Sequence, residues 1–298
     1  MQGQGQRPGM PDAAALMQAI GRLQSETMVL RRRLARMEAY EQLREAGREP
    51  SLPVDLRSQT GEDIVLWDLF RGQHDGFFIE AGAYDGTTLS VSYLFEAIGW
   101  KGLLVEAIPE ACSKCVASRP GSRVVNAALS KRGSSGEAAF TVVEGSEWKQ
   151  LFSYLHATPE HAARTQGCNR RSVRVPLTTL SALLETHTGP IDFLVLDVEG
   201  TEADVLDGLD LNRHRPRVMM IEDNTIGNNP ALDRAVGAGY TMAGLAGPNR
   251  VYIRSDEPAL LGRLGIGPGV QAPPPPAARP EPPVVHVPRI TPSSLPKR

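Results

Sequence analysis

Five short apolar runs in the middle of the chain constrain its fold more than any other feature of the sequence. They occupy residues 77–81, 102–106, 123–126, 193–196 and 218–221. Each run ends in or beside a polar residue, a glycine or a proline, and helix-like segments separate the runs. Apolar runs of this length with helices between them are typical of parallel strands that are buried on both faces. The sequence therefore predicts an α/β fold with a mostly parallel sheet and helices on both of its faces.

The turn after the first run carries the first candidate site, because ligands on such sheets bind beyond the carboxyl ends of the strands. The segment GFFIEAGAYDG ends its strand at Glu80 and continues through Gly82 and Gly86. Gly82 allows a sharp turn and the close approach of a ligand. A dinucleotide-binding GxGxxG motif would need glycines at 84 and 87, where the chain has tyrosine and threonine. Asp85, beside the next helix start, would also repel a pyrophosphate.

The second run ends at Glu106, 24 residues after Gly82. An acidic residue at this spacing on the neighbouring strand can accept hydrogen bonds from both hydroxyls of a ribose. The alternative is a surface glutamate that precedes a loop. A ribose without a pyrophosphate suggests S-adenosylmethionine, whose positive sulfonium would suit a pocket lined by Glu80, Asp85 and Tyr84.

Six segments together resemble the FkbM family of S-adenosylmethionine-dependent methyltransferases. They lie in family order between residues 58 and 253, and they read SQTGEDIVLWDLF, GFFIEAGAYDGTTLSVSYLFE, GWKGLLVEAIP, VVNAALS, VPLTTLSALL and IDFLVLDVEGTEADVL. The resemblance implies a class I (Rossmann-like) methyltransferase fold with a seven-stranded sheet. It also implies O-methylation of a hydroxyl on a sugar, a glycan or a glycosylated natural product. By the same resemblance, Glu80, Gly82 and Gly86 form the cofactor turn, Glu106 binds the ribose and Asn126 binds adenine.

The fourth run leads into the family pattern DvEGxE, which is complete here. Asp197 and Glu199 lie at the strand tip, where the methyl acceptor should bind. Either carboxylate is a candidate catalytic base or a group that orients the acceptor. His156 and His161, in the segment that should cover the substrate, are alternative bases.

The fifth run is followed by Glu222, Asp223 and Asn224. A set of Asp197, Asp223 and Asn224 resembles the magnesium site of catechol-type O-methyltransferases. Oxygen ligands of this kind suit Mg²⁺, which would lower the pKa of an acceptor hydroxyl. The alternative is a metal-independent reaction in which Asp197 or Glu199 acts directly.

The segment before this domain, residues 12–49, has the pattern of a helix that associates with another helix. Apolar residues recur at alternating spacings of four and three, with Leu16, Leu23, Leu30 and Met37 in one set and Ile20, Thr27, Leu34 and Glu41 in the other. Leucine at d and isoleucine at a favour a parallel two-stranded coiled coil and hence a homo-oligomer. The alternatives are an amphipathic helix lying on its own domain, or contact of the Arg31 to Arg33 run with acidic lipid.

The sequence divides into an N-terminal helix (1–50), the methyltransferase domain (51–266) and a tail (267–298). Proline makes up 11 of the last 31 residues, so we expect the tail to be disordered. The central domain holds 20 basic and 27 acidic residues, an excess of negative charge that disfavours a nucleic-acid substrate.

Three cysteines, Cys112, Cys115 and Cys168, are too few for a disulfide framework and favour a reducing compartment. Neither a signal peptide nor a membrane span is evident, and we expect a cytoplasmic protein. Two other functions compete with methyl transfer: a nicotinamide-linked oxidoreductase, which the missing glycines oppose, and a non-catalytic scaffold. The complete set of Glu80, Glu106 and Asp197 argues against the scaffold.

Overall fold

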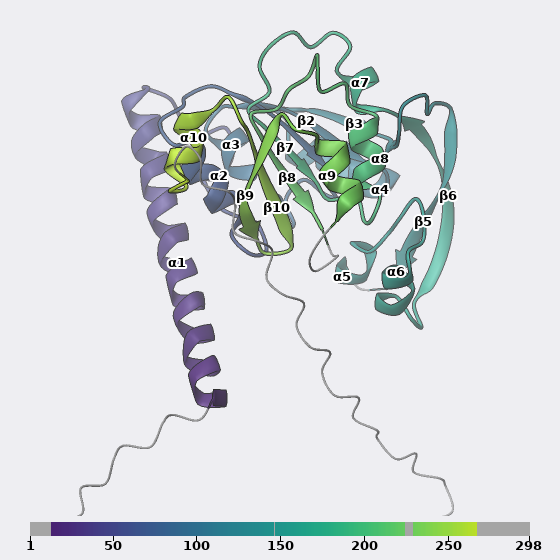
Figure 1. Cartoon of the computed structure of the whole chain (residues 1–298), viewed down its shortest axis with the longest axis horizontal. Coiled ribbons are helices and arrows are strands. Elements are labelled where there is room, and N and C mark those ends of the chain that lie inside the picture. The colour runs from purple at the N-terminus through teal and green to yellow at the C-terminus, as the bar shows by residue number, and fades with distance from the viewer. Residues whose placement is uncertain (1–12, 146, 224–228, 267–298) are drawn as a thin grey trace, which may run out of the picture.

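The computed structural model describes residues 13–145, 147–223 and 229–266. Its centre is a seven-stranded sheet (Figure 1). The strands are β1 (Phe77–Ala81), β2 (Lys101–Glu106), β3 (Arg123–Asn126), β7 (Phe193–Leu196), β8 (Val218–Glu222), β9 (Tyr240–Ala246) and β10 (Asn249–Arg254). Their order is β3-β2-β1-β7-β8-β10-β9, and β10 alone runs in the opposite direction to the other strands of this sheet. The predicted strands and the mostly parallel sheet are confirmed.

Both faces of this sheet are apolar because successive side chains of each strand alternate between two cores. Phe78 and Phe193 stack on one face, with ring centroids 5.5 Å apart. Ile79 and Leu194, the next residues along the same strands, belong to the core on the other face. Helices α2 (Glu62–Phe70), α3 (Tyr93–Ala97) and α10 (Pro258–Arg263) cover the first face, and α7 (Leu180–Leu183), α8 (Glu202–Asp207) and α9 (Pro230–Val236) cover the second. Helix α4 (Pro109–Ser118) connects β2 to β3.

A second, smaller sheet lies between β3 and β7 in the sequence. It consists of β4 (Ala128–Leu129), β5 (Glu137–Glu144) and β6 (Asn169–Thr178) in the order β4-β6-β5, and the short helices α5 (Glu147–Gln150) and α6 (Pro159–Arg164) connect β5 to β6. A third core, which includes Phe140, Val142 and Val175, joins this sheet to the turns that follow β1 and β2. The small sheet therefore packs beside the carboxyl ends of the central strands.

Helix α1 (Ala13–Glu45) is a single long helix that projects away from the rest of the molecule (Figure 1). Its C-terminal half packs on α2 and on the core through Ala35, Ala39 and Leu43. The Trp67 indole donates a hydrogen bond of 2.7 Å to Glu38, which fixes α1 against α2. Within the described ranges, no helix is both long enough and apolar enough to cross a membrane.

Candidate active site

A cavity of about 590 Å³ opens at the carboxyl ends of β1, β2, β7 and β8. The turns after these strands form its floor. The smaller sheet and α5 form its roof, and the segment around Thr60, with Pro248, closes one side. The cavity therefore lies where a ligand of this type of sheet is expected.

Gly82 makes the close approach of β1 and β7 possible beneath this cavity. Its φ is +88°, and a Cβ atom at this position would lie 1.7 Å from the carbonyl oxygen of Asp197. The Asp197 amide also donates to the carbonyl of Ala81 at 3.1 Å, so that the two strand ends are held together. A side chain at position 82 would separate the turns that follow β1 and β7.

Glu106 is buried at the end of β2 and lines the cavity. Its carboxylate accepts hydrogen bonds from two backbone amides, that of Tyr84 at 2.8 Å and that of Ile108 at 2.7 Å. Burial raises the pKa of Glu106 to about 7, although these two amides act in the opposite direction. Each carboxylate oxygen can accept one further hydrogen bond, which is what a ribose with two adjacent hydroxyls requires.

Glu80 lines the cavity, but its carboxylate mainly holds the loop between β1 and α3. It accepts from the Ser90 hydroxyl at 2.9 Å, from the Val91 amide at 2.8 Å and from the Ser92 hydroxyl. The fully buried Arg119 guanidinium lies 3.8 Å from it and donates to Ser90 and Ser92. Glu80 therefore stabilises the loop between β1 and α3 by holding residues 90–92 next to the end of β1.

Three residues expected to bind the cofactor do not line the cavity. The Asp85 carboxylate accepts hydrogen bonds from the amides and hydroxyls of Thr87 and Thr88. Gly86 faces α4, where a Cβ atom would lie 2.7 Å from the Arg119 side chain. The Asn126 amide nitrogen donates to the carbonyls of residues 106 and 107, at 2.8 and 2.9 Å, and the following segment, residues 127–129, lines the cavity instead. In this structure the three residues stabilise the turns around the cavity, and a direct contact with the cofactor stays a prediction.

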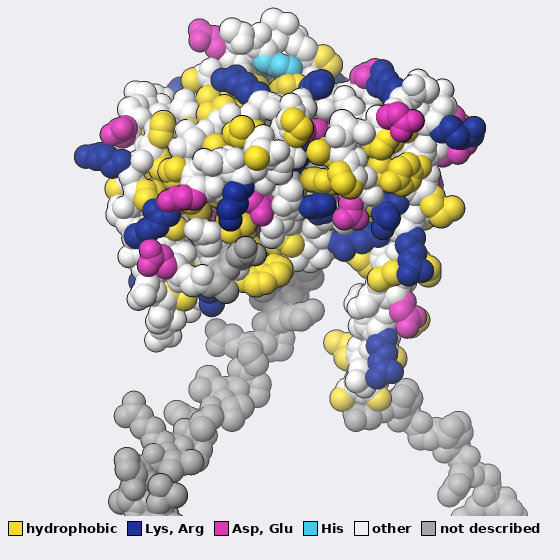
Figure 2. All heavy atoms as spheres, turned by 180° about the vertical axis from the view of Figure 1, so that it is seen from behind, with side chains coloured by type: hydrophobic (Ala, Val, Ile, Leu, Met, Phe, Trp, Pro, Cys, Tyr) yellow, Lys and Arg dark blue, Asp and Glu magenta, His cyan; other side chains and the backbone are white. Residues whose placement is uncertain are grey.

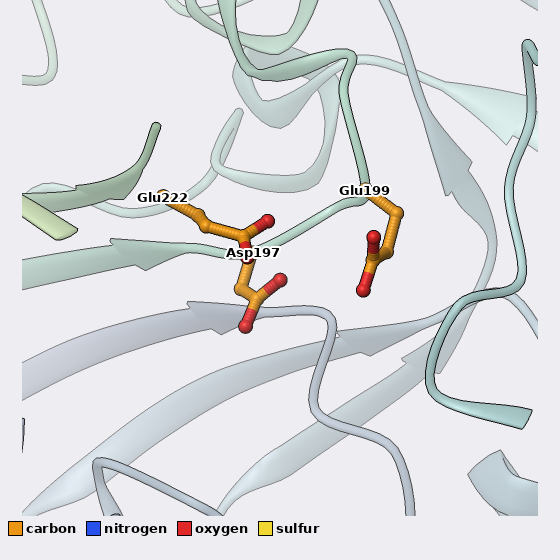
Figure 3. Close-up of side chains that lie close together, drawn as sticks. All are labelled: Asp197, Glu199 and Glu222. Atoms are coloured by element: carbon orange, nitrogen blue, oxygen red, sulfur yellow. The ribbon is translucent and has the colours of Figure 1, made fainter. Parts of the chain in front are cut away.

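Three carboxylates meet at the tips of β7 and β8. Asp197, Glu199 and Glu222 each offer an oxygen atom within 4.8 Å of the other two (Figure 3). The strand register explains this grouping, since Leu196 pairs with Ile221 and the next residues along both strands are Asp197 and Glu222. The two side chains therefore leave the same face of the sheet.

The carboxylate group at the cavity differs from the expected metal set of Asp197, Asp223 and Asn224. Asp223 follows Glu222 by one residue, so its side chain points to the opposite face. There its carboxylate forms an ion pair with Arg250 and accepts from the Asn229 amide at 3.1 Å. Asn224 lies outside the described residues. The acidic cluster in the cavity thus contains Glu222 in place of Asp223.

The carboxylates of the cluster lie close together at the wall of the cavity. Desolvation by the surrounding protein, and the charges of Glu222 and Glu199, raise the pKa of Asp197 well above its usual value, although its side chain is exposed to the cavity. Glu199 has a φ of +57°, which is uncommon for a residue other than glycine and marks a strained backbone. Glu202 stabilises this turn, because its carboxylate accepts from the amides of Val198 at 3.3 Å and Gly200 at 2.9 Å.

Aromatic and amide side chains from α5 and the residues after it form the roof of the cavity. It includes Trp148, Gln150 and Phe152, and the Tyr84 hydroxyl donates to the Gln150 side chain at 2.8 Å across the cavity wall. His156, one of the alternative bases, is exposed and does not line the cavity. The backbone of His161 lies in α6, but its side chain is not described.

The strand order β3-β2-β1-β7-β8-β10-β9, the glycine turn after β1 and the acidic residue at the end of β2 define a class I methyltransferase fold with its site in the usual place. The profile of the "Methyltransferase FkbM domain" matches residues 80–234, just over half of the chain. The chain belongs to the FkbM methyltransferase family.

Comparison with known proteins gave the following similarities. Among curated proteins, none matches the chain. Two similar solved structures are the methyltransferase candidate yhhF from Escherichia coli (13% identity, covering 68% of this chain and 90% of that chain, TM-score 0.36) and a TehB-like SAM-dependent methyltransferase from Corynebacterium glutamicum (14% identity, covering 72% and 94%, TM-score 0.34). A third is a candidate class I S-adenosylmethionine-dependent methyltransferase from Listeria monocytogenes (7% identity, covering 78% and 67%, TM-score 0.36).

Proposed function

We propose that this protein transfers a methyl group from S-adenosylmethionine to a hydroxyl group of a sugar, a glycan or a glycosylated natural product. Membership of the FkbM family supports methyl transfer. The observation that supports a hydroxyl acceptor is the acidic cluster of Asp197, Glu199 and Glu222. It lies at a cavity large enough for a nucleoside and part of a second ligand.

The cofactor half of the site is formed by the turns after β1 and β2. Glu106 accepts hydrogen bonds from the ribose hydroxyls, and Gly82, which lines the cavity, allows the ends of β1 and β7 to lie close together beneath the cofactor. Tyr84 presents an aromatic ring at the same wall. The negative charge of the acidic cluster favours a cationic sulfonium by Coulomb attraction. S-adenosylmethionine supplies an electrophilic methyl group at that sulfonium.

The acceptor half of the site is the acidic cluster. A sugar hydroxyl is almost fully protonated at neutral pH, so a base must take its proton as the new C–O bond forms. Because Asp197 and Glu222 lie close together, they share a proton, and the ionised oxygen serves as the base. The C–S bond breaks, its electron pair returns to sulfur, and the hydroxyl proton passes to the carboxylate.

A divalent cation would be held by Asp197, Glu199 and Glu222, whose carboxylate oxygens are the donors that Mg²⁺ prefers. It would lower the pKa of the acceptor hydroxyl. Methyl transfer in the presence of EDTA distinguishes a carboxylate base from a bound cation. Activity retained in EDTA supports the carboxylate base, whereas activity restored only by Mg²⁺ or Mn²⁺ supports the metal.

Methyl transfer from labelled S-adenosylmethionine to a panel of glycosides and sugars tests this function. We expect Asp197→Asn to lower kcat by about a hundredfold or more while it leaves S-adenosylhomocysteine binding within about threefold. Asp204→Asn is the matched control, since this carboxylate lies on α8 outside the cavity, and it should keep full activity. Transfer to amines or carboxylates with no transfer to any hydroxyl would contradict the proposal.

A further inference from the structure

The projecting part of α1 is a helix without a core of its own. Every residue from 14 to 27 is exposed. Helices of this length are marginal in water unless another surface covers their apolar side. Six large apolar side chains that share the heptad positions a and d are between 40% and 69% exposed: Leu16, Ile20, Leu23, Leu30, Leu34 and Met37. Figure 2 shows exposed hydrophobic side chains along this projecting helix.

The rest of the protein contacts the other side of α1. Its buried or half-buried residues are Met28, Arg32, Ala35, Glu38, Ala39, Gln42 and Leu43. Five of them occupy heptad positions b and f, which lie opposite the a and d positions on a helix, Leu43 occupies the adjacent position c, and Glu38 occupies position e at the edge of the stripe. The apolar stripe from Leu16 to Met37 therefore faces away from the methyltransferase domain, whose described residues contact only its edge, at Arg31 and Glu38.

The charged residues at the e and g positions, on either side of the apolar stripe, indicate which helix could pair with α1. In a parallel, in-register pair, each g residue meets the e residue five positions later in the partner. Glu26 (g) would then meet Arg31 (e), and Arg33 (g) would meet Glu38 (e), so both contacts pair opposite charges. Glu38 also accepts a hydrogen bond from Trp67 and lies 3.6 Å from Arg71 of its own chain, and 33% of its side chain remains exposed. Arg31 also forms an ion pair with Asp68 of its own chain, and 48% of its side chain remains exposed beside the stripe.

We propose that the occupant is α1 of a second copy of this chain, in a parallel two-stranded coiled coil that extends from Leu16 to Met37. The two-fold axis runs along the helices, and the two methyltransferase domains lie on the outer sides of the pair. The described lining of the cavity includes no residue of α1, so the pairing of these helices does not itself add a residue to the site.

Sedimentation velocity of the full chain between about 1 and 100 µM tests the interface. The wild type should have twice the 32.2 kDa mass of one chain. Leu23→Glu combined with Leu30→Glu places four carboxylates in the seam, and should give a monomer with unchanged S-adenosylhomocysteine affinity and folded circular dichroism. The double variant E26K/R33E turns both predicted ion pairs into repulsions, and should raise the dimer dissociation constant about tenfold or more.

A matched control keeps the net charge but changes only outward positions: Gln18→Lys with Arg36→Gln should leave the dissociation constant unchanged. A monomeric wild type, or a dimer that tolerates the leucine substitutions, would overturn the proposal. A dimer that is lost in the leucine variant but is unaffected by E26K/R33E would contradict the parallel register. A wild type that is monomeric and binds vesicles of acidic phospholipid would assign the stripe to a membrane surface instead.

Discussion

Replacement of Glu106 tests the placement of the cofactor. The carboxylate is buried, and its two oxygens each hold a backbone amide at 2.7 to 2.8 Å, which fixes their position at the end of β2. Two ribose hydroxyls that donate to this charged group would contribute about 1.5 to 3 kcal/mol to binding. We therefore expect Glu106→Ala to weaken S-adenosylhomocysteine binding by roughly 10 to 150 times, measured by isothermal titration calorimetry.

The pH dependence of S-adenosylhomocysteine binding is a second test of the cofactor's position at Glu106. Because burial raises the pKa of Glu106 to about 7, the unliganded group is increasingly protonated below that pH. Ribose hydroxyls favour the carboxylate form, so the affinity of the wild type should fall as the pH decreases from 7 to 5.5, by up to about tenfold per pH unit, and should be level above pH 8. Glu106→Gln should show weak binding and no such slope.

Glu110→Gln is the control, because this residue lies four positions later on α4, is exposed and pairs with Arg171 outside the cavity. It should reproduce both the affinity and the pH profile of the wild type. Circular dichroism must first show that the Glu106 variants are folded. A folded Glu106→Ala with wild-type affinity would refute the reasoning and move the cofactor away from the end of β2.

Two further predictions concern stability, measured by differential scanning calorimetry. Gly82→Ala should lower the free energy of unfolding by about 2 kcal/mol or more, because the new Cβ atom would overlap the Asp197 carbonyl. The control is Gly72→Ala, at a similar positive φ in open space, which should lower the free energy of unfolding by less. Equal losses in the two variants would contradict the overlap. Burial lowers the pKa of His214, so its contribution to stability is complete above pH 6.5 and is lost as the pH falls through the folded-state pKa. The Tm should therefore fall more steeply between pH 6.5 and 5 in the wild type than in His214→Gln.

Much of the fold could be predicted because buried parallel strands leave an unmistakable pattern. The runs at 77–81, 123–126 and 193–196 coincide with β1, β3 and β7, since both faces of these strands meet apolar helices. Helix α1 was also expected within residues 12–49, because its heptads have the helical period. The strands β5 and β6 were not located: they carry charged residues that are exposed on the surface, and their apolar positions serve a small separate core.

The candidate site was predictable only as far as local spacing determines it. Gly82 and Glu106 follow from the turn and from the strand spacing. Whether Glu222 or Asp223 joins Asp197 depends on the face of β8 from which each side chain projects. Val218, Met220 and Glu222 are two residues apart and share one face of the strand, so this spacing could have indicated Glu222. The supporting roles of Asp85 and Asn126 depend on hydrogen bonds to residues of the turns, which spacing alone does not reveal.

The central claim, a methyltransferase site for S-adenosylmethionine over β1 and β2, is tested most directly by calorimetric titration of the full chain with S-adenosylmethionine, S-adenosylhomocysteine and NAD. Glu106, for which we propose the ribose-binding role, is a buried carboxylate at the end of β2, and the turn after β1 has no GxGxxG motif for a pyrophosphate. We predict saturable one-to-one binding of both S-adenosyl compounds, with dissociation constants on the order of micromolar, and no heat of binding with NAD. Binding of NAD without binding of either S-adenosyl compound would contradict the account.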